Sequence, residues 1–132
     1  MRAMPVTMDG REYRVLVVYN SLVRAFELLE GENAGEMLSG RYERDLIGSQ
    51  YAYEMQIEPD PEHVGDYDDF YEAITAPQST HSVTMPYGQS TITFAARIIS
   101  GTDQFVGTVG GVKHWKALTV QFVPIQPQRS AT

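Results

Sequence analysis

The sequence predicts a mainly β fold, a β-barrel or sandwich of about seven or eight strands, with one short α-helix near residues 61–75. Several segments alternate apolar and polar residues, which is typical of half-buried strands. Turn-forming residues separate these segments at short intervals, and a single segment has the period of an amphipathic helix. A chain of 132 residues has the usual size of one domain. We therefore expect one β-rich domain over residues 1–127 and a flexible C-terminal tail over residues 128–132, after Pro127.

Residues 4–8 and 12–19 predict a β-hairpin at the start of the chain. Asp9-Gly10 lies between them and supplies the positive φ angles that a two-residue turn requires. The second strand is apolar on both faces between Tyr13 and Tyr19, which indicates either a central strand or an interface strand.

Residues 21–30 fit two patterns, because their apolar residues match a helical stripe and also an alternating strand. The strand is favoured, since the glycine-containing turn at residues 31–35 leads into another extended stretch at residues 36–47. The clearest strand of the chain follows at residues 49–58. Its apolar face carries Tyr51, Tyr53, Met55 and Ile57.

The predicted helix has a start signal and a stop signal. Asp60 is its expected cap, Pro61 suits the first helical position, and Pro77 ends it. We expect its buried stripe to contain Val64, Tyr67, either Phe70 or Tyr71, and Ile74.

The last third of the chain predicts three strands and one long loop. Residues 81–86 and 91–99 form a hairpin, and residues 112–123 form the last strand. Residues 100–111 are rich in glycine and are expected to form a loop, with Phe105 and Val106 near its tip.

The composition excludes several classes of function. Seventeen acidic residues stand against ten Lys and Arg, and eight of the acidic residues lie between Glu54 and Glu72, so specific nucleic-acid binding is not expected. The chain has no cysteine, and no apolar run approaches the about 20 residues of a membrane span. The first residues do not resemble a signal peptide, which favours synthesis in a cytoplasm.

Catalytic motifs are also missing from the sequence. His63, His81 and His114 lack metal-ligand spacing, and there is no GxSxG motif and no phosphate-binding loop. A cation site formed by His63, Asp66 and Asp69 is a weaker interpretation than a solvated helix end. We therefore expect no enzyme, no catalytic or metal-ligating residues and no cofactor.

The aromatic residues carry more information than the polar ones. Six of them are assigned to the core: Phe26, Tyr51, Tyr53, Phe70, Phe94 and Phe122. Five others lie near turns, where aromatic side chains either mark protein contacts or cap the ends of a barrel: Tyr19, Tyr42, Tyr87, Phe105 and Trp115.

Six stretches spread over almost the whole chain carry a family resemblance: MDGREYRV at residues 8–15, LEGENAG at 29–35, RDLIGSQYAY at 44–53, YDDFYEAI at 67–74, HSVTMPYG at 81–88 and FVPIQPQR at 122–129. In these stretches the sequence resembles small proteins encoded in prophages of Gram-positive bacteria. The resemblance implies a virion structural protein from the tail or baseplate region. The order of elements is also similar to that of tail-tube and distal-tail proteins, which stack as six-fold rings. The family brings no catalytic residues.

A ring subunit is expected to contact its own copies and neighbouring tail proteins, with no membrane partner, in a virion assembled in the host cytoplasm. A six-fold ring needs two different contact patches on each subunit. The candidates are the apolar strand with Tyr13, Val15, Val17 and Tyr19, and the loop region with Phe105, Val106 and Trp115. Three arginines are expected to pair with the acidic helix of a neighbour: Arg24, Arg41 and Arg44.

Two further interpretations remain open at this point. A phage neck or tail-completion protein would share the fold and differ in its place in the virion. A monomeric carbohydrate-binding β-module would use Tyr87 and Trp115 as stacking platforms.

Overall fold

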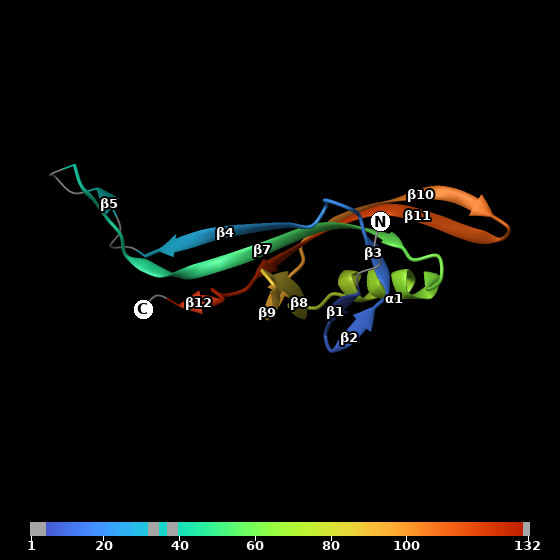
Figure 1. Cartoon of the computed structure of the whole chain (residues 1–132), viewed down its shortest axis with the longest axis horizontal. Helices are drawn as coiled ribbons and strands as arrows, with labels where there is room; N and C mark the ends of the chain where they lie inside the picture. The colour runs from blue at the N-terminus through green and yellow to red at the C-terminus, as the bar shows by residue number, and fades with distance from the viewer. Residues whose placement is uncertain (1–4, 32–34, 37–39, 131–132) are drawn as a thin grey trace.

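The computed structural model describes residues 5–31, 35–36 and 40–130, and within them the chain is elongated (Figure 1). The expected mainly β class with one helix is confirmed, since strands take up 61% of the residues. The elements in chain order are β1 Val6–Met8, β2 Arg11–Tyr13, β3 Val15–Val17, β4 Val23–Glu30, β5 Gly35–Glu36, β6 Tyr42–Glu43, β7 Leu46–Pro59, α1 Val64–Thr75, β8 His81–Tyr87, β9 Ser90–Arg97, β10 Gly101–Val109, β11 Val112–Pro124 and β12 Arg129–Ser130.

Ten strands form one antiparallel sheet that folds into two layers and stays open, and β5 and β6 form a separate pair. The long layer contains β4, β7, β11 and β10, and β1, β2, β8, β9 and α1 lie beneath its middle (Figure 1). Strand β11 belongs to both layers, because it pairs with β7 through residues 118–122 and with β9 through Val123 and Pro124.

The core lies between the two layers and follows the alternation in the sequence. Tyr53 of β7 stacks on Phe94 of β9 with ring centroids 5.9 Å apart, which joins the layers directly. The expected inward faces of β7, β8, β9 and β11 are confirmed, as is the helix face with Tyr67, Phe70 and Ile74. The largest fully buried side chains are Tyr53, Phe70, Phe122, Met8, Met55, Ile57, Met85 and Leu118.

The predicted hairpin at Asp9-Gly10 is present, and both residues have positive φ angles of 52° and 78°. The prediction of one continuous strand over residues 12–19 is wrong, because the chain breaks at Arg14. The backbone N–H of Arg14 donates to a carboxylate oxygen of Asp66 in α1 at 2.8 Å, so it does not take part in a strand ladder. As a result β2 stays in the hairpin with β1, and β3 crosses to pair with β7.

Strand β4 confirms the strand interpretation of residues 21–30, and the predicted helix is present with a later start. Helix α1 begins at Val64, not near residue 61. Asp60 does not cap it: its side chain accepts the N–H of Glu62 at 3.0 Å and its carbonyl accepts the N–H of His63 at 2.9 Å. These bonds close a turn before the helix, and Val64 is exposed instead of buried.

The loop expected at residues 100–111 is strand β10, which pairs with β11. Gly110 and Gly111 adopt φ angles of 59° and 80° and form the tight turn between the two strands. A β-bulge at Ala117, where φ is 57°, changes the register so that Trp115 and Leu118 both face the core side of the sheet.

The free tail expected from residue 128 is ordered as far as Ser130. Strand β12 pairs with β7, Arg129 with Ser49 and Ser130 with Gly48. The side-chain amide of Gln128 also accepts the N–H of Tyr51 and donates to its carbonyl, each at 2.9 Å. Residues 131–132 of the expected tail lie outside the described residues.

Candidate interaction surfaces

Two β-arms extend beyond the core at opposite ends of the sheet (Figure 1). One is the β4 arm, formed by β4 and residues 46–52 of β7, and the other is the hairpin tip, residues 105–115 of β10 and β11. Both arms expose large apolar side chains. On the β4 arm these are Val23, Phe26, Leu28, Leu46 and Ile47, and on the hairpin tip they are Phe105, Val106, Val109 and Val112.

Each arm also has an unpaired strand edge. Over the described residues, β4 pairs with β7 alone and β10 pairs with β11 alone. The two edges lie on opposite sides of the long layer, because β7 and β11 separate them. An exposed edge next to apolar side chains is a surface on which another strand can add.

The predicted interface strand does not provide a surface. Tyr13, Val15 and Val17 are buried in the core, where Tyr13 meets Phe70 edge-on with ring centroids 5.3 Å apart. Tyr19 is 79% exposed, in the segment between β3 and β4. The apolar pattern of residues 13–19 is compatible with both a core strand and an interface strand. It does not distinguish between the two.

Phe26 shows the opposite error. It was assigned to the core, and its side chain is 74% exposed on the β4 arm. It lies on the outer strand β4 and pairs with Tyr51, whose ring contacts Tyr87 of β8, yet the side chain of Phe26 itself stays uncovered. Phe105 and Val106 are exposed, as predicted, although on a strand and not in a loop.

The three predicted arginines are separated in the structure. Arg44 pairs with Glu30 at 2.7 Å and Arg41 pairs with Glu43 at 3.3 Å, so both have an acidic partner in their own chain. Hydrogen bonds from Tyr42 and Arg44 hold the pKa of Glu30 below its usual value. Arg24 is exposed and lies over the ring of Tyr87, 5.6 Å from its centroid.

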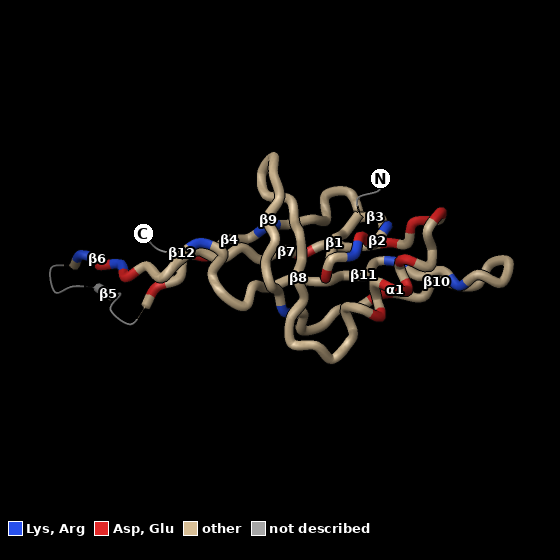
Figure 2. Tube along the Cα trace, turned by 90° about the horizontal axis from the view of Figure 1, so that it is seen from below, with Lys and Arg blue, Asp and Glu red and all other residues tan. Residues whose placement is uncertain are grey.

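The acidic helix has a cationic partner in its own chain, which the sequence pattern did not indicate. Arg11 contacts Asp69 at 2.8 Å and Asp66 at 3.8 Å, and its guanidinium lies over the ring of Tyr13. Acidic residues nevertheless gather around α1 at one end of the molecule (Figure 2). The cation site considered for His63, Asp66 and Asp69 is not formed, because His63 contacts Asp60. The described residues contain no cluster suited to a metal ion.

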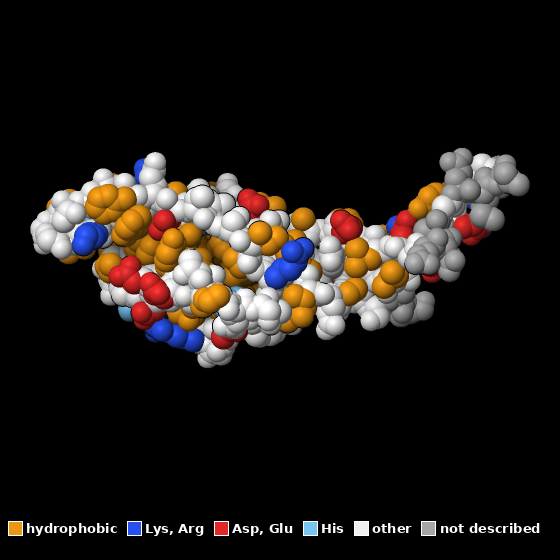
Figure 3. Space-filling model, turned by 180° about the vertical axis from the view of Figure 1, so that it is seen from behind, with side chains coloured by type: hydrophobic (Ala, Val, Ile, Leu, Met, Phe, Trp, Pro, Cys, Tyr) orange, Lys and Arg blue, Asp and Glu red, His pale blue; other side chains and the backbone are white. Residues whose placement is uncertain are grey.

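A groove of about 960 Å³ separates α1 from the hairpin tip. In Figure 3 apolar side chains gather in a hollow between this hairpin and the acidic residues of the helix. The charged and polar lining consists of Glu58 of β7, Asp68 of α1, and Lys113 and His114 of β11. The apolar lining consists of Pro59, Pro61, Val64, Val106, Val109, Val112 and Trp115.

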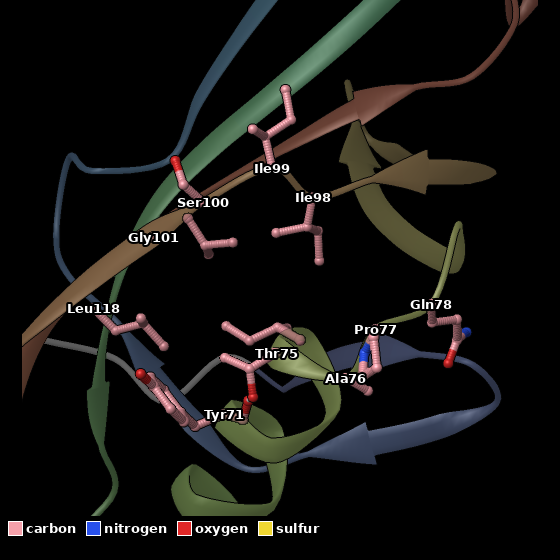
Figure 4. A pocket seen from close by; sticks show the side chains of 12 residues that line it. Tyr71, Thr75, Ala76, Pro77, Gln78, Ile98, Ile99, Ser100, Gly101 and Leu118 are labelled. Atoms are coloured by element: carbon pink, nitrogen blue, oxygen red, sulfur yellow. The ribbon is translucent and has the colours of Figure 1, made fainter.

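A smaller pocket of about 430 Å³ lies at the C-terminal end of α1, where Ile98, Ile99 and Gly101 face Tyr71 and Thr75 (Figure 4). The hydroxyl of Thr75 donates to the carbonyl of Tyr71 at 2.7 Å, so it serves the helix itself. The described lining contains no Asp, Glu, His, Lys or Arg. This pocket therefore has no group for acid–base chemistry near neutral pH.

Two buried side chains, Tyr67 and His81, each hydrogen-bond to a more exposed aspartate. Burial, together with a hydrogen bond to Asp103 at 2.9 Å, raises the pKa of Tyr67, which keeps the phenol protonated and donating. His81 is 3% exposed and donates from Nδ1 to Asp9 at 2.7 Å.

Tyr87 and Trp115, the proposed sugar platforms, both have ring partners. Tyr87 meets Tyr51 edge-on at 5.3 Å and donates to its hydroxyl at 3.1 Å. Trp115 packs against the core and lies 5.0 Å from the ring of Phe105. Both rings are half-buried, so neither presents a free face comparable to that of Phe26.

Comparison of the sequence with protein-family models and with curated proteins finds no match to either. The described helix is too short and too polar to cross a membrane. The two exposed arms and the groove beside one of them are thus the features from which a function has to be argued.

Proposed function

We propose that this chain is a virion structural protein of a phage or prophage tail, a tail-tube or baseplate subunit that assembles with its own copies into rings, with six copies per ring. The observation that carries the proposal is the pair of different apolar arms at opposite ends of an open sheet. The family resemblance described above supplies the place in the virion and the number of copies.

The geometry of the arms favours a head-to-tail contact. Two identical patches would form a two-fold dimer, whereas two different patches join one copy to the next and close into a ring when the rotation permits. The β4 arm and the hairpin tip differ in sequence, in charge and in shape. Each can therefore be covered only by a different surface of the next copy or by a different tail protein.

The acidic character of the chain agrees with this role. The formal net charge of −7 disfavours adsorption to DNA, which a tail protein must allow to pass. Ring contacts consequently have to come from apolar surface and from local ion pairs, and both arms provide apolar surface.

Light scattering of the purified chain, with negative-stain images of any large species, tests the proposal. Rings or stacked tubes whose mass rises with concentration are expected. A strict monomer at high concentration would refute the ring-building role. A monomer that also binds glycans would establish the carbohydrate-binding alternative, which the half-buried Tyr87 and Trp115 do not favour.

A further inference from the structure

The groove between α1 and the hairpin tip has an apolar floor that none of the described residues covers. Val109 is 71% exposed, and Val64, Val106 and Val112 are exposed beside it. Uncovered valines on two facing elements indicate a site that a partner side chain fills, because water cannot satisfy such surface.

The β4 arm carries a strand face with matching chemistry. Arg24, Phe26 and Leu28 point to the same side of β4, since they pair with Tyr53, Tyr51 and Ser49 of β7. Phe26 and Leu28 are the apolar part of this face, and Arg24 is the charged part. The outer edge of β4 is unpaired over the described residues, so the strand can approach another molecule closely.

The groove carries two carboxylates, Glu58 of β7 and Asp68 of α1, against one lysine, Lys113, so its formal charge is opposite to that of Arg24. Asp66 and Asp69 face Arg11 of the same chain, whereas Asp68 lines the groove. An arginine two residues before Phe26 is placed to meet an acidic rim when the phenylalanine enters the apolar floor.

The two surfaces cannot meet within one molecule, because they lie at opposite ends of the same sheet (Figure 1). The occupant of the groove must therefore belong to another molecule. A second copy of this chain carries the matching strand, β4.

We infer that the groove between α1 and the hairpin tip receives strand β4 of a second copy, with Phe26 on the apolar floor and Arg24 beside Glu58 and Asp68. The inference rests on the proposed function and adds the register of its subunit contact. Since the contact is head-to-tail, every copy offers one groove and one β4 arm to its neighbours.

Two variants separate the two halves of this contact. Phe26→Asp places a charge on the β4 arm and leaves the groove intact, and Val109→Asp does the reverse. Both side chains are largely exposed, at 74% and 71%, so both variants are expected to fold like the wild type. Tyr19→Asp is the matched control, because Tyr19 is equally exposed at 79% and lies outside both surfaces.

Sedimentation velocity over a range of concentrations measures the effect. Each of the two variants is expected to weaken self-association by at least about tenfold, and Tyr19→Asp is expected to match the wild type. An equimolar mixture of Phe26→Asp and Val109→Asp is expected to form a species of two chains and to stop there, because only one intact contact is possible.

A charge exchange tests the register. Arg24→Glu alone and Asp68→Arg alone should each weaken association. The chain carrying both substitutions should recover it, because the two exchanged charges, one on each copy, would again be opposite in sign across the contact. If the Phe26→Asp and Val109→Asp variants both assemble as the wild type does, the inference is overturned and the proposed function still stands. A wild-type chain that remains monomeric would overturn the proposed function and the inference together.

Discussion

Asp9 joins the first hairpin to β8, and its replacement is predicted to cost a large part of the stability of the domain. One carboxylate oxygen accepts the N–H of Ser82 at 2.8 Å, and the other accepts Nδ1–H of His81 at 2.7 Å. The N–H of Asp9 donates in turn to the carbonyl of Ser82 at 2.7 Å. Asp9 also has a φ angle of 52°, which Asp and Asn tolerate better than Ala.

The magnitude follows from these contacts. Asp9→Ala leaves the buried ring of His81 without its acceptor, which costs about 1–3 kcal/mol. An alanine at positive φ adds about 1 kcal/mol. We therefore expect a loss of about 3 kcal/mol in the free energy of unfolding at pH 7. Asp9→Asn keeps the acceptor for Ser82 and tolerates the backbone angle, so it should lose only about 1 kcal/mol.

The same contact predicts a dependence on pH. Burial raises the pKa of Asp9, but the hydrogen bonds from His81 and Ser82 together lower it by more. The net pKa therefore lies below the ordinary value of 3.8. A carboxyl group with a lowered pKa stabilises the folded state above its unfolded pKa and loses this effect as the pH falls through its folded pKa. The stability difference between wild type and Asp9→Asn should therefore be full above about pH 5 and shrink below about pH 4.

Urea unfolding followed by the fluorescence of Trp115 measures these differences, since this single tryptophan packs against the core. Equal losses for Asp9→Ala and Asp9→Asn would refute the argument, because the two variants differ in the hydrogen bond to Ser82 and in the tolerance of positive φ. If the stability difference between wild type and Asp9→Asn stays constant down to pH 3, it does not come from the charged carboxylate of Asp9, and this part of the argument is refuted.

Four further variants test other contacts. Phe122→Ala should cost about 3–5 kcal/mol in urea unfolding, whereas Phe26→Ala should change the stability by less than about 0.5 kcal/mol, because only Phe122 is buried. Gly48→Ala should detach strand β12, since its new methyl group would collide with the backbone of that strand, and hydrogen exchange of the Tyr51 amide should then become faster. Tyr67→Phe should lower the free energy of unfolding by about 1 kcal/mol by removing the bond to Asp103, and the wild-type phenol should resist ionisation in alkaline titrations followed by ultraviolet absorbance.

The parts of the fold that could be predicted from sequence depend on neighbouring residues. Strand β7 alternates cleanly because one of its faces is buried over Tyr53, Met55 and Ile57. The first hairpin was found from Asp9-Gly10 because the turn type depends on the φ angles of those two residues alone.

The elements that were missed depend on contacts between distant residues or lack a buried face. The break at Arg14 requires Asp66, which is 52 positions away, and the order of β12 requires Gln128 to bind Tyr51 across 77 positions. Strand β10 was read as a loop because its glycines are turn formers and its exposed residues do not alternate. Propensity rules carry no information on such pairings.

Only part of the interaction surfaces could be predicted from the sequence. Phe105 and Val106 were identified because exposed apolar residues near a turn stand out in the sequence. An aromatic residue in a strand is usually buried, which predicts a core position for Phe26, but it lies on the outer strand β4, where the second layer does not cover it. A sequence pattern records which residues are apolar and does not record where the covering layer stops.

The length of β7 is the strongest physical argument that the arms are used. This strand runs for 14 residues, about 45 Å, whereas strands of globular domains are usually about 5–6 residues long. It is buried over the second layer at Tyr53, Met55 and Ile57, and β4 pairs with residues 46–54, most of which extend past this buried part. The hairpin tip has two strands, and β12 adds a short third strand to the β4 arm. Narrow extensions of this kind, with apolar side chains and an unpaired edge, are prone to edge-to-edge association. The proposed head-to-tail contact between copies would cover both arms at once.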